Sequence, residues 1–508
     1  MGLKGLVKDT AIYGLSSIIG RFLNWCLVPL YTIMFPAEEY GMVTYIYSFV
    51  ALALIILTYG METGLFRFSK HDDYTPSTVY TTTLTSVGTT SMLFVALILV
   101  MLSPISEMMN CGDTPSFVWI MVVTVAIDAF TAIPFAYLRF RQRAVRFAIL
   151  KMTNIGLNIG LNLFFILLCP WIWKVAPDTI SWFYNPDYGI GYIFAANLIS
   201  SAVVLLLLLP DITGEKYRFD MKLLRTMLVF SFPLLIAGLA GIMNQNVDKI
   251  LYPKLVADTA EAMEGLGIYG ANYKIAVVMI MFIQAFRFAY EPLMFSRKTE
   301  NREQKNLEYR KAMTFFVIFA LLIFLGVMFY LDFLKYFIAP SYFVGLKVVP
   351  ILLMAEFCYG IFFNLSLWYK NIDKTYWAVI FSLAGFIVMV VLNVVFVPQY
   401  GYIACAWAAL ACNVVMMTAS YLVGRKKNPI GYDLGRIGLY FVIAMSLYGL
   451  SYLFETPWFW LNILIRTILL VGYIVIVLKR ESINLFVLVM RRGKQKQYKI
   501  NEGCSHKS

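Results

Sequence analysis

Residues 12–32 read IYGLSSIIGRFLNWCLVPLYT, an apolar stretch about as long as a bilayer is thick, with one charged residue, Arg21, near its middle. A helix needs about 20 such residues to cross the hydrocarbon core of a membrane. Similar stretches recur along all 508 residues, about 14 of them at this length. The sequence therefore predicts an all-α polytopic membrane protein. We expect spans at residues 9–34, 41–61, 77–103, 117–138, 147–169, 188–209, 223–245, 266–292, 312–331, 342–369, 376–396, 401–423, 437–453 and 458–478.

The composition excludes several other classes of protein. Hydrophobic residues make up 60% of the chain and charged residues 14%, and the mean hydropathy is +0.74, which rules out a soluble globule or a disordered chain. The net charge of +13 suits anionic lipid headgroups and topology determination, so we expect no nucleic-acid partner. Seven cysteines without a Cys-x-x-Cys pair, and two histidines, predict no metal site and no cofactor.

The lysines and arginines divide by side of the membrane. When the connections are numbered alternately, 33 of the 42 cations fall on the side of the N-terminus. Five fall on the other side and four lie within spans. The five are Lys174, Lys249, Lys254, Lys335 and Lys347, and the four are Arg21, Lys274, Arg287 and Arg466. Because cytoplasmic loops carry the excess of positive charge, this division predicts that both termini are cytoplasmic.

The chain also repeats itself. Tyr40-Gly41 opens the second span and Tyr269-Gly270 opens the eighth, and at the same offset of 229 residues Glu62 matches Glu291. The order of spans is kept, so we expect two six-helix lobes related by a parallel pseudo-two-fold repeat, with a central cavity between them. The predicted divisions are the N-terminal lobe 1–215, the C-terminal lobe 216–430, two additional spans in 431–480 and a basic cytoplasmic tail 481–508, whose body reads as an amphipathic helix.

At this point the residues resemble a known family. The opening stretch, the segment EYGMVTYIYSF at 39–49 and the layout of twelve spans plus two are similar to the Wzx-type oligosaccharide flippases of the multidrug/oligosaccharidyl-lipid/polysaccharide (MOP) exporter superfamily. The resemblance covers nearly the whole chain. It implies a flippase, not an enzyme, that moves undecaprenyl-diphosphate-linked oligosaccharides across the bacterial cytoplasmic (inner) membrane by alternating access. It also implies the lipid-linked oligosaccharide and membrane lipids as partners, with polysaccharide polymerase and glycosyltransferases as candidates.

Charges within spans are costly and need a partner or a wet cavity. Arg21, Lys274 and Arg287 are therefore candidates to bind the phosphates of the substrate, since arginine matches phosphate oxygens in a two-pronged geometry. For Arg21 the alternative is a structural ion pair with Asp128 or Glu356. For Arg287 it is a pair with Glu291 at the i, i+4 spacing.

Uncharged polar residues and carboxylates complete the candidates. Asn154, Asn158 and Asn162 form a stripe on the fifth span, placed either to bind sugar hydroxyls or to tie helices together. The candidates for coupling to a proton or sodium gradient, or for structural ion pairs, are Asp128, Glu356, Glu62 and Glu291.

Two other functions remain open from the sequence. A cation-coupled multidrug or small-solute exporter of the same fold is the first, although the cationic residues within spans count against it. A membrane polysaccharide polymerase is the second, but it needs a large exterior catalytic loop. The longest exterior loops predicted here, 170–187 and 246–265, are too short for one.

Overall fold

The computed structural model describes residues 13–296, 302–370, 374, 376–454 and 456–481, apart from residues 15 and 17. Within α12 and at the start of α13, the side chains of residues 289, 291–296 and 302 fall outside this description. The predicted tail helix also lies outside the described residues. The part of the chain that the structure describes consists of helices joined by short connections, and it contains no β-strand.

Thirteen helices in the described residues are long and apolar enough to cross a membrane, and a shorter apolar helix, Ile18–Met34, corresponds to the first predicted span. The prediction of an all-α polytopic membrane protein is confirmed. The helices up to the middle of the chain are α2 (Val28–Met34), α3 (Ala37–Thr58), α4 (Met61–Phe68), α5 (Pro76–Val100), α6 (Leu102–Met108), α7 (Pro115–Phe140), α8 (Ala144–Leu163), α9 (Cys169–Val175) and α10 (Gly191–Thr213). They are followed by α11 (Met221–Leu255), α12 (Thr259–Ser296), α13 (Arg302–Phe329), α14 (Leu331–Leu334), α15 (Val349–Leu365), α16 (Leu367–Lys370), α17 (Tyr376–Tyr400), α18 (Tyr402–Lys427), α19 (Leu434–Leu453) and α20 (Phe459–Arg480).

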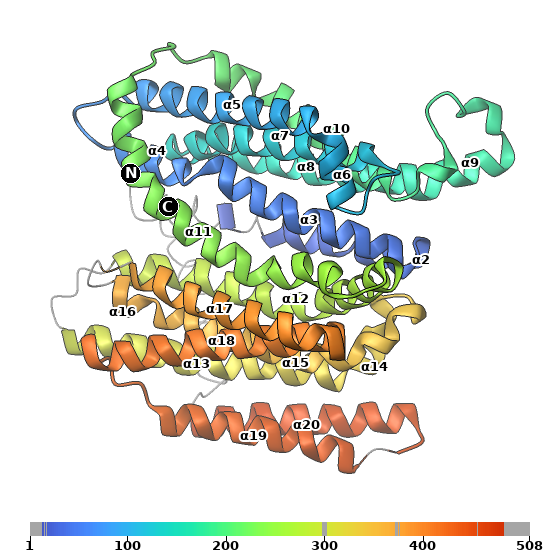
Figure 1. The fold of residues 1–508 in the computed structure, drawn as a ribbon. Coiled ribbons are helices and arrows are strands. Elements are labelled where there is room, and N and C mark those ends of the chain that lie inside the picture. The colour runs from blue at the N-terminus through green and yellow to red at the C-terminus, as the bar shows by residue number, and fades with distance from the viewer. Residues whose placement is uncertain are drawn as a thin grey trace, which may run out of the picture. The chain divides into compact units, whose positions relative to one another are not determined.

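The chain forms two compact units. The larger contains residues 1–302 and 335–430, and the smaller contains 303–334 and 431–508. Within the larger unit, α5, α7, α8 and α10 pack as one group and α11, α15, α17 and α18 as another, while α3 packs along both α12 and α11 (Figure 1). Most of these helices are apolar around much of their circumference, as expected for helices that face lipid on one side and a packed interior on the other.

The smaller unit is held by polar contacts between its helices. Arg466 of α20, which is 8% exposed, pairs with Asp332 at 2.6 Å. The hydroxyl of Tyr473 donates to the backbone oxygen of Ile318 in α13. One of the four cations predicted within spans is therefore used in an ion pair that joins α20 to the α13–α14 segment.

One end of the larger unit is rich in paired cations, and we call it the basic face. It contains the connections α4–α5, α7–α8 and α10–α11. The ion pairs there include Arg139 with Glu62 at 2.7 Å, Arg141 with Glu215 at 2.7 Å and Arg146 with Asp211 at 2.6 Å. The α2–α3 junction and α9 lie at the opposite face, because each intervening span reverses the direction of the chain (Figure 1).

Candidate binding cavity

The larger unit contains a cavity of about 610 Å³ between the N-terminal segment and α3 on one side and α11, α12 and α15 on the other. The first half of the chain contributes side chains from segment 21–31 and α3, and the second half contributes side chains from α11, α12 and α15. The polar and charged lining residues are Arg21, Asn24, Trp25, Tyr31, Tyr40, Thr44, Tyr47, Ser48, Gln245, Asn246, Lys249, Tyr273, Lys274, Gln284, Arg287 and Tyr359. This combination of amides, hydroxyls and aromatic rings suits a polar ligand of considerable size.

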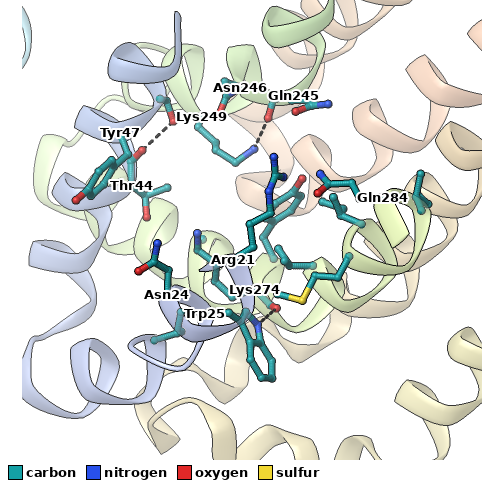
Figure 2. Close-up of a pocket in the computed structure, with 18 of the residues that line it drawn as sticks. Arg21, Asn24, Trp25, Thr44, Tyr47, Gln245, Asn246, Lys249, Lys274 and Gln284 are labelled. Atoms are coloured by element: carbon teal, nitrogen blue, oxygen red, sulfur yellow. Dashed lines mark hydrogen bonds between the residues drawn. The ribbon is translucent and has the colours of Figure 1, made fainter. Parts of the chain in front are cut away.

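The charge of the cavity has one sign. Arg21, Lys249, Lys274 and Arg287 line it, and none of the lining residues that the structure describes is Asp or Glu. In Figure 2, Arg21 and Lys249 extend from different helices toward the same region of the cavity. Arg287 also lies over the ring of Phe363, 4.8 Å from the centroid. The three predicted cations are thus brought together, and a lysine that the sequence had not selected joins them.

Lys249 corrects the predicted end of the seventh span. The sequence predicts that it lies in an exterior loop, but α11 continues to Leu255 and Lys249 is buried within this helix, 6% exposed. The predicted span ended early because Asp248 and Lys249 interrupt its hydropathy. An acidic and a basic residue in succession can neutralise each other within a helix. The adjacent Asp248 and Lys249 were therefore the feature of the sequence that could have indicated a longer span with a buried lysine.

The cavity is closed at the face opposite the basic face by direct contact of α3 with α12. A Cβ atom added to Gly41 would lie 1.8 Å from the backbone oxygen of Met263, and one added to Gly267 would lie 1.8 Å from that of Ala37. Only glycine allows two helix backbones to approach so closely. The Tyr342 hydroxyl donates to the Phe35 carbonyl at 3.0 Å across the same junction. These contacts join the two halves of the larger unit at this face.

The N-terminal helix is attached to α12 beside the cavity. The indole of Trp25 donates to the backbone oxygen of Lys274 at 2.7 Å (Figure 2), and its ring stacks on Phe337 with the centroids 3.8 Å apart. Buried indole groups commonly combine stacking with one hydrogen bond in this way. Both contacts position Arg21, one turn earlier in the same helix.

Two buried carboxylates lie behind the α12 wall of the cavity. Tyr269 donates to Asp248 at 2.7 Å and Tyr273, one turn later, donates to Glu356 at 3.1 Å. Both carboxylates line a small space of about 20 Å³, together with Asn244 and Asn413. The Oδ1 atom of Asn244 has no hydrogen-bond partner among the described residues. Glu356 is therefore connected to the cavity by a hydrogen bond from Tyr273, which lines it. Its hydrogen-bond partner is this tyrosine rather than the predicted Arg21.

The predicted asparagine stripe is hydrogen-bonded, directly or through Asn197, to tyrosines that line the cavity. Tyr31, which lines the cavity, donates to Asn162 at 3.0 Å, and Asn158 donates to Asn197 at 2.8 Å. Asn197 in turn donates to the hydroxyl of Tyr47, a second lining residue. Asn158 and Asn162 are buried, so their amides join α8 to α10 and to the cavity tyrosines without lining the cavity.

The remaining predicted residues lie elsewhere. Asp128 of α7 accepts a hydrogen bond from Ser201 at 2.7 Å, and Glu62 pairs with Arg139 at the basic face. Asn154 is partly buried on α8 and does not line the cavity. The side chain of Glu291 lies outside the described residues.

Comparison with known proteins agrees with this architecture. A family model described as "Polysaccharide biosynthesis protein" matches residues 6–298. A solved structure of the lipid II flippase MurJ in an inward closed conformation covers 94% of this chain and 100% of its own, with a TM-score of 0.69 and 14% identity. An inward-facing multidrug resistance MATE family transporter of the MOP superfamily covers 80% of this chain and 94% of its own, with a TM-score of 0.64 and 14% identity. A solved structure of the MATE multidrug transporter DinF-BH covers 85% and 98%, with a TM-score of 0.61 and 15% identity. No curated protein matches the chain by sequence. At these identities the structural likenesses show the fold.

Proposed function

Since the chain belongs to the family of polysaccharide biosynthesis proteins, we propose that it is a flippase for lipid-linked oligosaccharides that serve surface polysaccharide synthesis. The family and the fold confirm the resemblance to the MOP exporter superfamily. The transported lipid is undecaprenyl diphosphate bearing an oligosaccharide, and no covalent bond is made or broken.

The observation that carries this proposal is the charge of the cavity. Four cations line it, and no carboxylate does so among the described residues. A diphosphate presents dense negative charge to which guanidinium and ammonium groups donate strong hydrogen bonds. The amides of Asn24, Gln245 and Gln284 also line the cavity (Figure 2) and suit sugar hydroxyls. The polyprenyl tail stays in the bilayer while the head group crosses.

Alternating access supplies the mechanism of crossing. Two bundles that rock about a shared site expose it to each side in turn. Separation of α3 from α12 at Gly41 and Gly267 would open the face that is now closed. We assign the basic face to the cytoplasm of a bacterium, with both termini there and the protein in the inner membrane, because cytoplasmic loops carry the positive charge.

Reconstituted transport tests the function. The purified chain is placed in liposomes with a fluorescent undecaprenyl-diphosphate oligosaccharide, and a membrane-impermeant reductant measures how much label reaches the outer leaflet. We expect the protein to accelerate this exchange, and we expect Arg225→Gln, an exposed α11 arginine outside the cavity lining, to act as the wild type. If the rate equals that of protein-free liposomes, the flippase proposal is wrong.

We also propose that transport is coupled to a proton or sodium gradient through Glu356 and Asp248, with Asp128 as the acid of the other half. Two carboxylates and the Asn244 oxygen, which has no hydrogen-bond partner among the described residues, lie around a space of about 20 Å³. They supply the oxygen ligands that hard cations prefer. Lys249 now neutralises Asp248 and also lines the cavity. An entering diphosphate that attracts Lys249 would leave Asp248 without its counter-charge, so a cation could take the place of the lysine.

Dissipating each gradient separately in the same liposomes tests this coupling. We expect flipping against a concentration difference to stop when the coupling gradient is removed, and we expect Glu356→Gln to lose the dependence. Flipping that is indifferent to both gradients would contradict the coupling and leave the flippase proposal intact.

A cation-coupled multidrug exporter is the alternative supported by the MATE-like fold. Its cationic substrates would be repelled by the four cavity cations. If the reconstituted protein transports a lipophilic cation and does not exchange the lipid-linked oligosaccharide, the multidrug-exporter alternative is favoured.

A further inference from the structure

A second hollow lies on the N-terminal half, away from the central cavity, at the basic face. It is a groove of about 630 Å³ between the first turns of α8 and the last turns of α10. Its lining residues are Gln142, Arg143, Ala144, Val145, Arg146, Ile149, Leu150, Thr153 and Leu207. Neither the family nor the proposed function assigns a ligand to it.

One end of the groove is polar and basic. Arg146 donates to Asp211 of α10 through Nε at 2.7 Å, and Arg143 lies 3.5 Å from the same carboxylate. One carboxylate thus serves two guanidinium groups, which leaves a net positive charge and N–H donors in excess of its oxygens. The side chains of Arg143 and Arg146 remain 58% and 42% exposed, so this end can bind an anion.

The rest of the groove is apolar and follows α8 into the membrane. Leu150 and Leu208 are buried in the core between α7, α8 and α10, while their neighbours Ile149 and Leu207 are 59% and 43% exposed. From Ala144 to Thr153 a helix rises about 14 Å. The groove therefore runs from a basic site at the membrane surface to an apolar channel at the depth of the acyl chains.

We propose that this groove binds an anionic phospholipid of the leaflet at the basic face. The phosphate lies against Arg143 and Arg146, and one acyl chain lies along Ile149, Thr153 and Leu207. Charge complementarity selects this occupant. A zwitterionic lipid carries an ammonium group that the two arginines repel, whereas the net negative charge of an anionic headgroup is attracted to each nearby basic residue. The site is independent of the flippase proposal, because it neither contacts nor requires the transported lipid.

Native mass spectrometry of the delipidated full-length protein tests the site. We expect phosphatidylglycerol to be retained about 25-fold better than phosphatidylcholine, because each of the two arginines contributes about fivefold. Arg143→Gln should reduce phosphatidylglycerol binding about fivefold. Leu207→Trp, which fills the apolar part without changing charge, should also reduce it. Arg141→Gln is the matched control, because Arg141 is on the same turn but pairs with Glu215 outside the groove.

The remaining arms of the experiment separate other occupants. If inorganic phosphate displaces the lipid completely and Leu207→Trp has no effect, the groove binds an anion and not a lipid. If undecaprenyl phosphate displaces phosphatidylglycerol at much lower concentration, the occupant is the polyprenyl carrier. Equal retention of both phospholipids by the wild type, or an Arg143→Gln protein that binds as the wild type does, would overturn the proposal. Because Arg143 is the more exposed of the two arginines and the more distant from Asp211, this variant is expected to fold.

Discussion

Lys249 and Asp248 are consecutive residues of α11 and yet form a buried ion pair, with Nζ 3.1 Å from Oδ1. Consecutive residues on a helix do not normally face each other. The lysine stem curves back so that Nζ also donates to the carbonyl of Gln245 at 2.7 Å (Figure 2). A flexible stem held in this way can exchange partners, which makes Lys249 the link between the cavity and the buried acids.

Lys249→Met should separate the two roles of this lysine. Removing one partner of a buried pair leaves an uncompensated charge and costs about 3–5 kcal/mol of stability. We therefore expect a clear fall in thermal unfolding temperature. Sodium ions should raise that temperature more for the variant than for the wild type, because a cation can take the place of the lysine beside Asp248. The double variant Asp248→Asn/Lys249→Met should regain stability but not transport. A double variant that flips at the normal rate would show that Lys249 is only structural.

Arg21→Gln should slow flipping without unfolding the protein. Arg21 is exposed to the cavity, so its loss leaves no buried charge. A charge-assisted hydrogen bond contributes about 1.5–3 kcal/mol, which corresponds to a fall in rate of about tenfold or more at low substrate concentration. Arg21→Lys should recover part of the rate, and the Arg225→Gln protein provides the reference. Unchanged flipping in Arg21→Gln at equal protein content would exclude Arg21 from substrate binding.

The helices could be predicted from the sequence because membrane spans obey two local rules, apolar length and alternating loop charge. Every predicted span within the described residues matches an apolar helix. The same rules explain the failure at Lys249. Hydropathy scores Asp248 and Lys249 as two charges, although within α11 they neutralise each other.

The partners of the site residues could not be predicted in the same way. The sequence placed Arg21, Lys274 and Arg287 within spans, and the structure brings them to one cavity. It could not show that Glu356 accepts from Tyr273 or that Asp128 accepts from Ser201. Those contacts depend on how two helices are rotated against each other, and side-chain spacing along one helix carries no information about that rotation.

Glu215 at the basic face should make stability depend on acidity. Partial burial alone would raise its pKa, but hydrogen bonds from Tyr137, Ser77 and Arg141 and the charge of Arg141 lower the pKa below the ordinary value. A carboxyl whose pKa is lower in the folded state stabilises the fold above its unfolded pKa of about 4.3, and this contribution is lost as the pH falls through the folded pKa. Glu215→Gln should therefore flatten the decline of unfolding temperature below about pH 4.3. Solvent screening limits the stabilisation that is lost there to about 1 kcal/mol. An unaltered acid profile would show that the Arg141 pair contributes nothing.

Gly41→Ala should open the closed end of the cavity. The added Cβ would lie 1.8 Å from the Met263 carbonyl, and a backbone atom cannot rotate out of the way, so α3 and α12 must separate. We expect Asn24→Cys, a cavity position, to react several-fold faster with an impermeant thiol reagent applied opposite the basic face, with the labelled residue identified by mass spectrometry.

Gly156→Ala is the matched control for this substitution. Gly156 is also within a helix, but a Cβ there meets nothing within 4 Å. The control should gain up to about 1 kcal/mol in helix propensity and leave the labelling rate unchanged. Gly41→Ala should not show this stabilisation, because α3 must move away from α12 to accept the added Cβ. The outcome that would contradict this is labelling of the cysteine at position 24 at the same rate in both glycine variants as without them, with both proteins folded. Contact between the Gly41 and Gly267 backbones would then not close the cavity, and the barrier would lie at Tyr342 and Trp25 instead.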